Sequence, residues 1–321
     1  MSAAAASGPS LEGHRRELFA LCYRMTGSAA DAEDLEQETV ARAVERPPPD
    51  TGRPWRPWLV RVATNLARDH LRRRRRRGYA GPWLPEPVET EALLPALHEP
   101  AATAGRYELL ESVSFAFLVA LEALTPMQRA VLVLCDVLDY AAAEAAEALD
   151  SSPGAVRTTL HRARRRMAGY DAARPPPSPE VSDATRALLE RFVLSMAAGD
   201  VAGMESLLAE DAVALNDGGG VYAAARVPVV GAGKVARFHR KLVRRGQPLT
   251  HAELRELNGL PALLGAYPED PARPHLAPRF AVLPVPDRAG RLRMLCTVVA
   301  PAKLARLGAI APLSGPLRGG S

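Results

Sequence analysis

The stretch LTPMQRAVLVLCDVLDYAAAEAAEALDSSPGAVRTTLHRARRRM, residues 124–167, decides the fold of the segment that contains it. Its pattern predicts two short helices, a tight turn and a third helix rich in arginine. Thr125 is a suitable N-cap, Pro126 suits a first helical turn, and Gln128 completes the spacing of a capping box. Apolar residues then recur at helical spacing, and we expect the second helix over about 140–149.

The third helix combines an apolar seam with a basic outer face. The seam consists of Val156, Leu160, Ala163 and Met167. Such a helix fits the major groove of DNA, with its N-terminal side chains at base edges and its arginines on phosphates. The residues that we expect to contact DNA are Ser152, Pro153, Arg157, Thr158, His161, Arg162 and Arg165. A helical hairpin with a solvated basic face is the alternative.

A second basic element lies upstream, in PWRPWLVRVATNLARDHLRRRRRRGYA, residues 54–80. It follows a proline-rich loop, has helical spacing and ends in the arginine run 72–77. Arginine neutralises phosphate and aromatic rings stack on unpaired bases, a combination that suits a duplex being opened. The candidate DNA contacts are Trp55, Trp58, Arg61, Asn65, Asp69, Arg72 and Arg73. The alternative is that both tryptophans are core anchors.

The segment DAEDLEQE, residues 31–38, predicts a helix with an acidic face. Asp31, Asp34 and Glu38 share that face at helical spacing. The residues that can face a core are Ala32, Leu35, Thr39 and Ala43. Composition alone favours an ordinary acidic solvent face here.

These three segments, in this order, resemble the regions of bacterial sigma factors. The stretch LFALCYRMTGSAADAEDLEQETVARA, residues 18–43, and the tryptophan- and arginine-bearing helix resemble region 2, and residues 124–167 resemble region 4. The likeness covers about residues 11–170 and is to the minimal, extracytoplasmic-function type. Two positions depart from the family pattern: Ala145 replaces a large aliphatic residue, and Asp150 replaces a glycine. Aspartate tolerates a left-handed turn conformation better than most residues.

The resemblance implies a role for each segment. The basic upstream helix is expected to melt and read the −10 promoter element, and the third helix of residues 124–167 to read the −35 element. The acidic helix is expected to dock on the β′ clamp of core RNA polymerase. The residues that correspond to this docking surface are Asp31, Asp34, Leu35, Gln37 and Glu38. A helix-turn-helix regulator that binds DNA without polymerase is the alternative.

Proline-rich stretches divide the chain of 321 residues into modules. We expect a flexible tail over 1–10, region 2 over 11–78, a linker over 79–107, region 4 over 108–170, a second linker over 171–182, a C-terminal domain over 183–305 and a tail over 306–321.

The C-terminal part changes in character. Helices are expected over 182–198, 202–208 and 233–245, and strands over 212–215, 223–230, 261–267, 280–285 and 292–299. Helices followed by antiparallel strands argue for an α+β cone. The segment resembles the SnoaL-like branch of the NTF2-like superfamily, in which NGLPALL, residues 258–264, corresponds to a strand start. The fold class is therefore two all-α sigma domains plus an α+β SnoaL-like domain.

Sigma factors with such an extension form a subgroup whose marks recur here. WLPEP stands at 83–87 in the linker, DGGG at 217–220, where Val221 replaces the usual lysine, and APAKL at 300–304. The resemblance implies that the extension packs against core sigma and tunes its activity in cis. The candidate regulatory residues are Trp83, Leu84, Pro85, Glu86, Pro87, Asp217, Gly218, Gly219, Gly220, Lys303 and Leu304. A linker that lies on its own sigma modules is the alternative.

Other function classes find little support. The formal net charge is +5, and the three cysteines share no metal-ligand spacing, so we expect a cytoplasmic protein without metal or cofactor. No window has the apolar length of a membrane span. The extension has no paired-carboxylate or nucleophile–base spacing among its acid–base candidates, which are Asp211, Asp217, His239 and His251. A SnoaL-like enzyme, or a small-ligand sensor, fused to a helix-turn-helix regulator stays open as the alternative.

Overall fold

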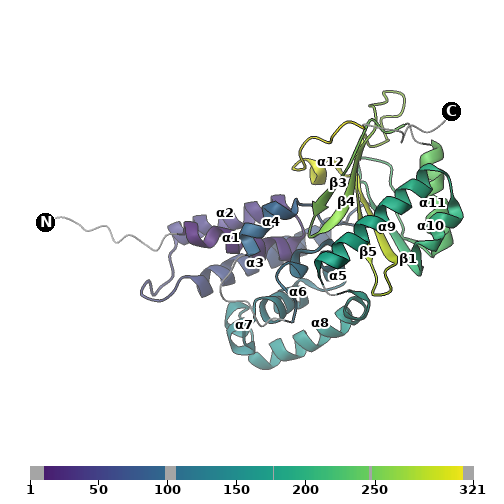
Figure 1. Cartoon of the computed structure of the whole chain (residues 1–321). Helices are drawn as coiled ribbons and strands as arrows, with labels where there is room; N and C mark the ends of the chain where they lie inside the picture. Colours follow the sequence, from purple (N-terminus) through teal and green to yellow (C-terminus); the bar gives the residue numbers. More distant parts are fainter. Residues whose placement is uncertain (1–10, 98–105, 176, 246–247, 314–321) are drawn as a thin grey trace. The chain divides into compact units, whose positions relative to one another are not determined.

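The computed structural model describes residues 11–97, 106–175, 177–245 and 248–313, and they form two compact units (Figure 1). The first unit takes its described residues from Met1–Arg77, Glu91–Val113 and Ala120–Ala168. The second unit takes them from Gly78–Thr90, Ser114–Val119 and Gly169–Ser321. The segment around WLPEP therefore belongs with the C-terminal domain. The expected tail over 1–10 lies outside the described residues.

The first unit begins with three helices: α1 (Glu12–Thr26), α2 (Ala29–Glu45) and α3 (Arg56–Arg77). Ser28 caps α2, because its hydroxyl accepts a hydrogen bond from the Asp31 N–H at 3.2 Å. The inward face of α2 is the expected one, with Ala32, Leu35, Thr39 and Ala43 buried.

Residues 126–173 form the predicted helix-turn-helix: α6 (Pro126–Leu132), the π-helical segment η2 (Val133–Val137), α7 (Ala142–Ala148) and α8 (Pro153–Ala173). The capping box of Thr125 and Gln128 is present. Asp150 has φ +50°, so aspartate occupies the left-handed position where the family has glycine. The helix expected over 140–149 is shorter, because Ala141 has an extended conformation and acts as the N-cap.

Between these modules lie α4 (Thr90–Leu97), the single 3₁₀ turn η1 (Glu111–Val113) and α5 (Phe115–Leu121). The linker expected over 79–107 therefore contains a helix. The second linker is also shorter than expected, because α8 continues to Ala173 and the next helix begins at Pro179. Ser178 caps that helix and proline takes its first position.

The second unit contains a six-stranded sheet and the helices α9 (Pro179–Ala197), α10 (Val201–Ser206), α11 (Ala232–Arg245) and α12 (Pro301–Leu304). The strands, in the order β2-β1-β6-β5-β4-β3, are β1 (Leu208–Asp217), β2 (Val229–Val230), β3 (His251–Leu257), β4 (Leu260–Ala266), β5 (Arg279–Pro286) and β6 (Leu292–Val298). Strands β3 to β6 form an antiparallel meander, and its last strand returns beside β1 in parallel. The expected antiparallel strands are present, and the parallel pair of β1 and β6 makes the sheet mixed.

Three details of this unit differ from expectation. The strand expected over 223–230 is reduced to Val229–Val230, because residues 218–222 form a turn. Strand β3 was not expected, because it lies at the sheet edge and alternates charged and apolar residues that are mostly half-buried. The tail expected over 306–321 is structured as far as Leu313, where Pro312 bridges to His251. Residues 314–321 lie outside the described part.

The two faces of the sheet have separate cores. One face packs against α9, α10 and α11 through Phe192, Met204 and Val235. The other face packs against α12 and against two segments from elsewhere in the chain, represented by Leu84 and Phe115. The second core therefore contains a residue of WLPEP and the first turn of α5.

Candidate DNA-binding faces and the linker site

Helix α8 has the predicted two-sided character. Val156, Ala163 and Met167 are buried and Leu160 is half-buried. The hydroxyl of Ser152 caps the helix by accepting the Ala155 N–H at 3.2 Å. Every candidate contact to the −35 element is exposed: Ser152, Pro153, Arg157, Thr158, His161, Arg162 and Arg165. The outer face of the helix is therefore free in this unit.

One arginine of α8 has an orienting role that the sequence did not reveal. Arg164 donates two hydrogen bonds to the buried carboxylate of Asp136 in η2, from Nε at 3.0 Å and from Nη2 at 2.6 Å. This pairing raises the pKa of the Arg164 guanidinium. A bidentate pair fixes a planar group in one orientation, so it sets the rotation of α8 relative to η2. The sequence offered one sign of this pairing: Asp136 stands in a mostly apolar segment, where a buried carboxylate requires a partner.

Helix α3 presents a partly exposed face in the first unit. Trp58 and Asn65 are half-buried, and Asp69, Arg72 and Arg73 are exposed. Two of the candidate arginines form ion pairs within the unit. Arg72 pairs with Asp69 at 3.0 Å, and Arg61 contacts Asp150 in the turn before α8.

The interpretation of Trp55 as a stacking platform is corrected by its burial. Its side chain lies in the core, with only 9% of its surface exposed. A ring whose faces pack against protein cannot stack on a base in this conformation. The core-anchor alternative holds for Trp55, while Trp58 keeps a partly exposed ring.

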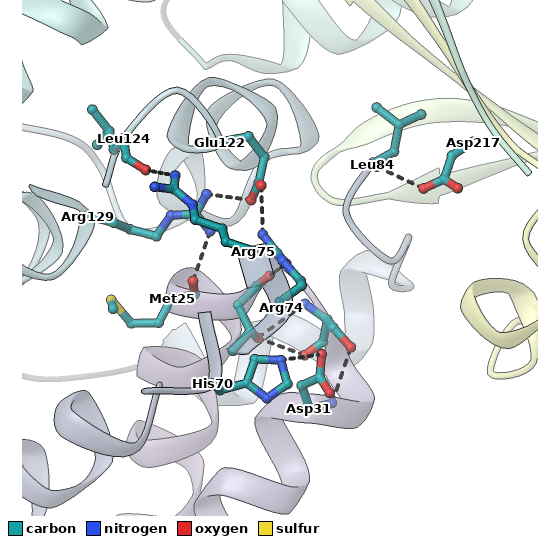
Figure 2. A network of polar contacts seen from close by, with 12 residues as sticks. Met25, Asp31, His70, Arg74, Arg75, Leu84, Glu122, Leu124, Arg129 and Asp217 are labelled. Carbon is teal, nitrogen blue, oxygen red and sulfur yellow. Dashed lines mark hydrogen bonds and ion pairs between the residues drawn. The ribbon is translucent and has the colours of Figure 1, made fainter. Parts of the chain in front are cut away.

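The arginine run at the end of α3 divides between solvent and the interior. Arg74 pairs with Glu122 at 2.6 Å and donates to the Thr26 carbonyl at 2.8 Å. Arg75 donates to the Leu124 carbonyl. Figure 2 shows these two guanidinium groups directed at Glu122 and Leu124, within the segment expected to form region 4. Part of the run expected on DNA is thus engaged between regions 2 and 4.

Glu122 is the centre of this network because it also pairs with Arg129 (Figure 2). Arg129 is almost wholly buried and donates to the Met25 carbonyl at 2.8 Å. Burial alone would raise the pKa of Glu122, but Arg129 and Arg74 outweigh it and hold that pKa below its ordinary value. The carboxylate therefore neutralises two cations that join α3 to the start of the helix-turn-helix.

The acidic helix α2 exposes part of its predicted docking surface. Asp34, Gln37 and Glu38 are exposed. Asp31 lies 3.3 Å from His70 of α3; burial would raise its pKa, but the hydrogen bond and charge of His70 outweigh burial and lower it. Leu35 is buried against the neighbouring helices, so it supports the helix instead of lining its surface.

The carboxylate of Asp217, at the end of β1, is a buried hydrogen-bond acceptor in the second unit. It has no exposed surface and accepts hydrogen bonds from the Leu84 N–H at 2.8 Å, the Tyr79 hydroxyl at 2.5 Å and the Gly219 N–H at 2.9 Å. Figure 2 shows the bond from Leu84. Because two of these donors come from the segment before WLPEP and from WLPEP itself, Asp217 holds that segment on the C-terminal domain.

Lys303 of APAKL completes the charge balance. Its ammonium group lies 2.7 Å from Asp217, donates to the Leu84 carbonyl, and lies over the ring of Trp83 at 4.0 Å from the centroid. A desolvated ammonium over an indole adds a cation–π attraction. Val221, which replaces the subgroup's lysine, is exposed. Lys303 is thus the cation that faces Asp217.

The rest of the WLPEP segment is also seated in the second unit. Leu84, Pro85, Glu86 and Pro87 are buried, and Leu84 packs in one core with Leu304. Glu86 pairs with Arg306 at 3.4 Å. Past the motif, the Val88 N–H bonds the Asn258 side chain at 3.0 Å, and Glu89 forms a bridge with Leu257 of β3. The segment thus binds the sheet with both side chains and backbone, and the alternative of a linker lying on its own sigma modules does not describe residues 84–89.

The glycines after Asp217 have a structural reason. A Cβ at Gly218 would collide with the Tyr222 carbonyl, and Gly219 and Gly220 have φ of +63° and +76°. The turn that they form keeps the Asp217 carboxylate against its donors. The role of these glycines is therefore to set the backbone path of the turn.

The acid–base candidates of this unit are spread over three elements, since Asp211 and Asp217 share β1 while His251 and His239 lie on β3 and α11. Asp211 is exposed on β1, His251 is half-buried on β3, and His239 is buried on α11, where burial lowers its pKa. Asp217 is saturated by the donors described above. Among the described residues, no group of three or more histidine, cysteine, aspartate or glutamate residues could hold a metal ion. Within the same residues, every helix is too short or too polar to span a bilayer.

Comparison with known proteins gives these elements a family. Residues 11–77 match Sigma-70 region 2, and residues 114–167 match Sigma-70, region 4. The chain is 36% identical over 299 residues to the ECF RNA polymerase sigma factor SigJ of Mycobacterium tuberculosis, an alignment that covers 91% of each chain. It is 39% identical over 227 residues to SigG of the same species, although it spans only 59% of the length of SigG.

The crystal structure of SigJ confirms the expected fold class. It superposes with a TM-score of 0.70 and 32% sequence identity, and the match covers 92% of this chain and 97% of that one. The match therefore includes the SnoaL-like domain as well as both sigma regions. From the geometry of α2, α3 and α8 and from these relatives, the chain belongs to the extracytoplasmic-function sigma factors of RNA polymerase.

Proposed function

We propose that this chain directs core RNA polymerase to promoters, with α8 reading the −35 element and α3 the −10 element. The observation that carries the proposal is that all seven candidate −35 contacts are exposed while the seam beneath them is buried and Arg164 fixes the helix. Asp34, Gln37 and Glu38 of α2 are the proposed contacts to the β′ clamp. A factor that works on chromosomal DNA acts in the cytoplasm.

Arg157 provides the test of −35 reading. Replacing it with alanine should weaken promoter binding by about 1–3 kcal/mol if the guanidinium bonds a base edge in two places. The matched control is Arg191→Ala, an exposed arginine on α9 of the other unit. Binding of the holoenzyme to promoter fragments, with every base of the −35 element varied in turn, should show relaxed preference at one or two positions. Unchanged preference would remove Arg157 from the reading residues.

The same proposal includes regulation in cis by the SnoaL-like domain. Its support is the seat formed by Asp217 and Lys303, which ties residues 79–89 to the C-terminal domain, and the placement of Phe115 in the same core. Residues 79–89 lie between regions 2 and 4 in the sequence, and Phe115 begins region 4. A domain that binds the connection between two promoter-reading modules limits the separations that they can adopt.

A second candidate role of the C-terminal domain is small-ligand sensing. Two buried side-chain nitrogens, Nδ2 of Asn216 and Nε2 of His239, have no hydrogen-bond partner among the described residues, and buried polar groups without partners are costly. If a ligand satisfies them, the unliganded protein should become more stable when Asn216 is replaced by leucine. We expect Tm to rise by about 2–4 °C for each kcal/mol gained. A fall in Tm would assign Asn216 to ordinary packing.

A further inference from the structure

Helix α11 has an unusually clean division between an apolar and a basic side. At 3.6 residues per turn, its described basic residues fall within about 120° of the helix circumference. They are Lys234, Arg237, Arg240, Lys241 and Arg244, and all five are exposed. Val235, Ala236 and His239 on the other side are buried against the sheet and α9. Packing therefore fixes the direction in which the basic side faces.

The charges of this basic side are not balanced within the unit. The sequence of α11, AGKVARFHRKLVRR, contains no acidic residue. None of the five side chains forms an ion pair with any described residue, although Glu205 of α10 lies beside Gly233 together with Arg237. Several other arginines of the same unit do pair with acids: Arg186 with Glu256, Arg255 with Glu89, Arg273 with Asp270 and Arg293 with Asp211.

We propose that the basic side of α11, from Lys234 to Arg244, binds the phosphate backbone of duplex DNA. It is a third DNA contact, independent of α3 and α8, and it rests on the proposed function only in that the protein works on promoters. Lys234 and Arg244 are ten positions apart, or about 15 Å along the helix axis. A duplex carries one charge per about 1.7 Å of its axis, so this length faces several phosphates. Contacts to phosphate carry no sequence information, so we expect this contact to be independent of the DNA sequence.

An anionic membrane is the other surface that a basic amphipathic helix can bind, and the packing of α11 argues against it. Membrane binding requires the apolar side to enter the lipid. Here that side is occupied by the protein core, and only Leu242 and Val243 in the last turn are exposed large apolar residues of the helix. A helix with a buried apolar side and a free basic side fits a polyanion that is bound from outside.

The test compares two triple variants of the full chain with equal loss of charge. Arg237→Gln, Lys241→Gln and Arg244→Gln change α11. The control changes three exposed arginines elsewhere in the same unit, Arg191→Gln, Arg226→Gln and Arg291→Gln. Binding to a mixed-sequence 40-base-pair duplex is measured by fluorescence anisotropy at several salt concentrations, without polymerase. The same proteins are mixed with phosphatidylglycerol vesicles.

If α11 lies on phosphates, its triple variant should lower the slope of log K against log salt by about 2 to 3, since each lost phosphate contact contributes about 0.9. The control should lower it by less than 1. Equal slopes for the two variants would overturn the proposal. So would a selective loss of vesicle binding with DNA binding unchanged, which would assign α11 to a membrane surface. Because polymerase is absent, neither result depends on whether the chain is a working sigma factor.

Discussion

Replacing Asp217 by alanine is expected to release the WLPEP segment from the C-terminal domain. The carboxylate is fully buried and balances Lys303, so its removal leaves an uncompensated cation and three unpaired donors. Breaking a buried ion pair from one side costs about 3–5 kcal/mol. Hydrogen exchange reports the loss locally: the Leu84 amide, which donates to Asp217, should exchange on the order of 10²-fold faster or more.

The control for this variant is Asp211→Ala on the same strand. Asp211 is exposed and lies 3.4 Å from Arg293, an arrangement that contributes little to stability. Exchange at Leu84 should be unchanged in the control. A second comparison, Asp217→Asn with Lys303→Met, removes both charges and should recover part of the loss. If Leu84 exchanges equally fast in the wild type and in Asp217→Ala, Asp217 does not hold the segment.

The second large effect is expected at Glu122, which links regions 2 and 4. Glu122→Gln leaves Arg129 buried without a counter-charge and removes one of the partners of Arg74, so we expect a loss of about 3–5 kcal/mol in the first unit. The separation of the two regions should become easier, and Arg74 and Arg75 should become available to DNA. Non-specific DNA affinity should therefore rise while the urea midpoint falls.

The pH dependence follows from the same pair. The folded-state pKa of Glu122 is lowered, so its contribution is fully present above the unfolded value of about 4.3 and is lost as pH falls through the folded pKa. The difference in urea midpoint between wild type and Glu122→Gln should shrink below about pH 4. The control is Glu12→Gln, whose carboxylate is 80% exposed and pairs with Arg15. A constant difference from pH 7 to pH 3 would show that folding does not lower the pKa of Glu122.

Local rules predicted the helices of the sigma regions well. Thr125 begins a helix where expected, and Ser28 and Ser152 cap their helices in the same way, because each supplies a hydroxyl to an unpaired N–H of the first turn. The candidate −35 contacts lie on an exposed face because the seam of Val156, Ala163 and Met167 fixes which side is buried. The periodicity of apolar residues was sufficient to predict the buried face, since each of these helices packs along one stripe of apolar side chains.

Long-range pairing was harder to predict. Nothing in the sequence near Glu122 indicates Arg74 and Arg129 as partners, and Trp55 is buried for reasons of tertiary packing. The parallel pairing of β1 with β6 and the edge strand β3 depend on contacts between residues far apart in the chain. The motif residues Asp217 and Lys303 were identified by resemblance, but their shared contact with Leu84 required coordinates.

Point variants are better suited to this protein than removal of residues 183–321. Leu84 and Phe115 are buried in one core with residues of the C-terminal domain, including Cys296. A truncated chain would expose this apolar surface, and its behaviour would reflect aggregation as well as release. Asp217→Asn preserves the shape of the side chain while it removes the charge that holds Lys303.

The most direct measurement is transcription from genomic DNA by core RNA polymerase, with the full-length wild type, Asp217→Asn and the control Asp211→Asn, and with transcript 5′ ends mapped by sequencing. We expect all three to bind core enzyme and to initiate at the same set of promoters. Transcript yield should differ from wild type for Asp217→Asn and match it for Asp211→Asn. Failure of the wild type to bind core enzyme, with transcripts from no defined start sites, would contradict its assignment to promoter recognition.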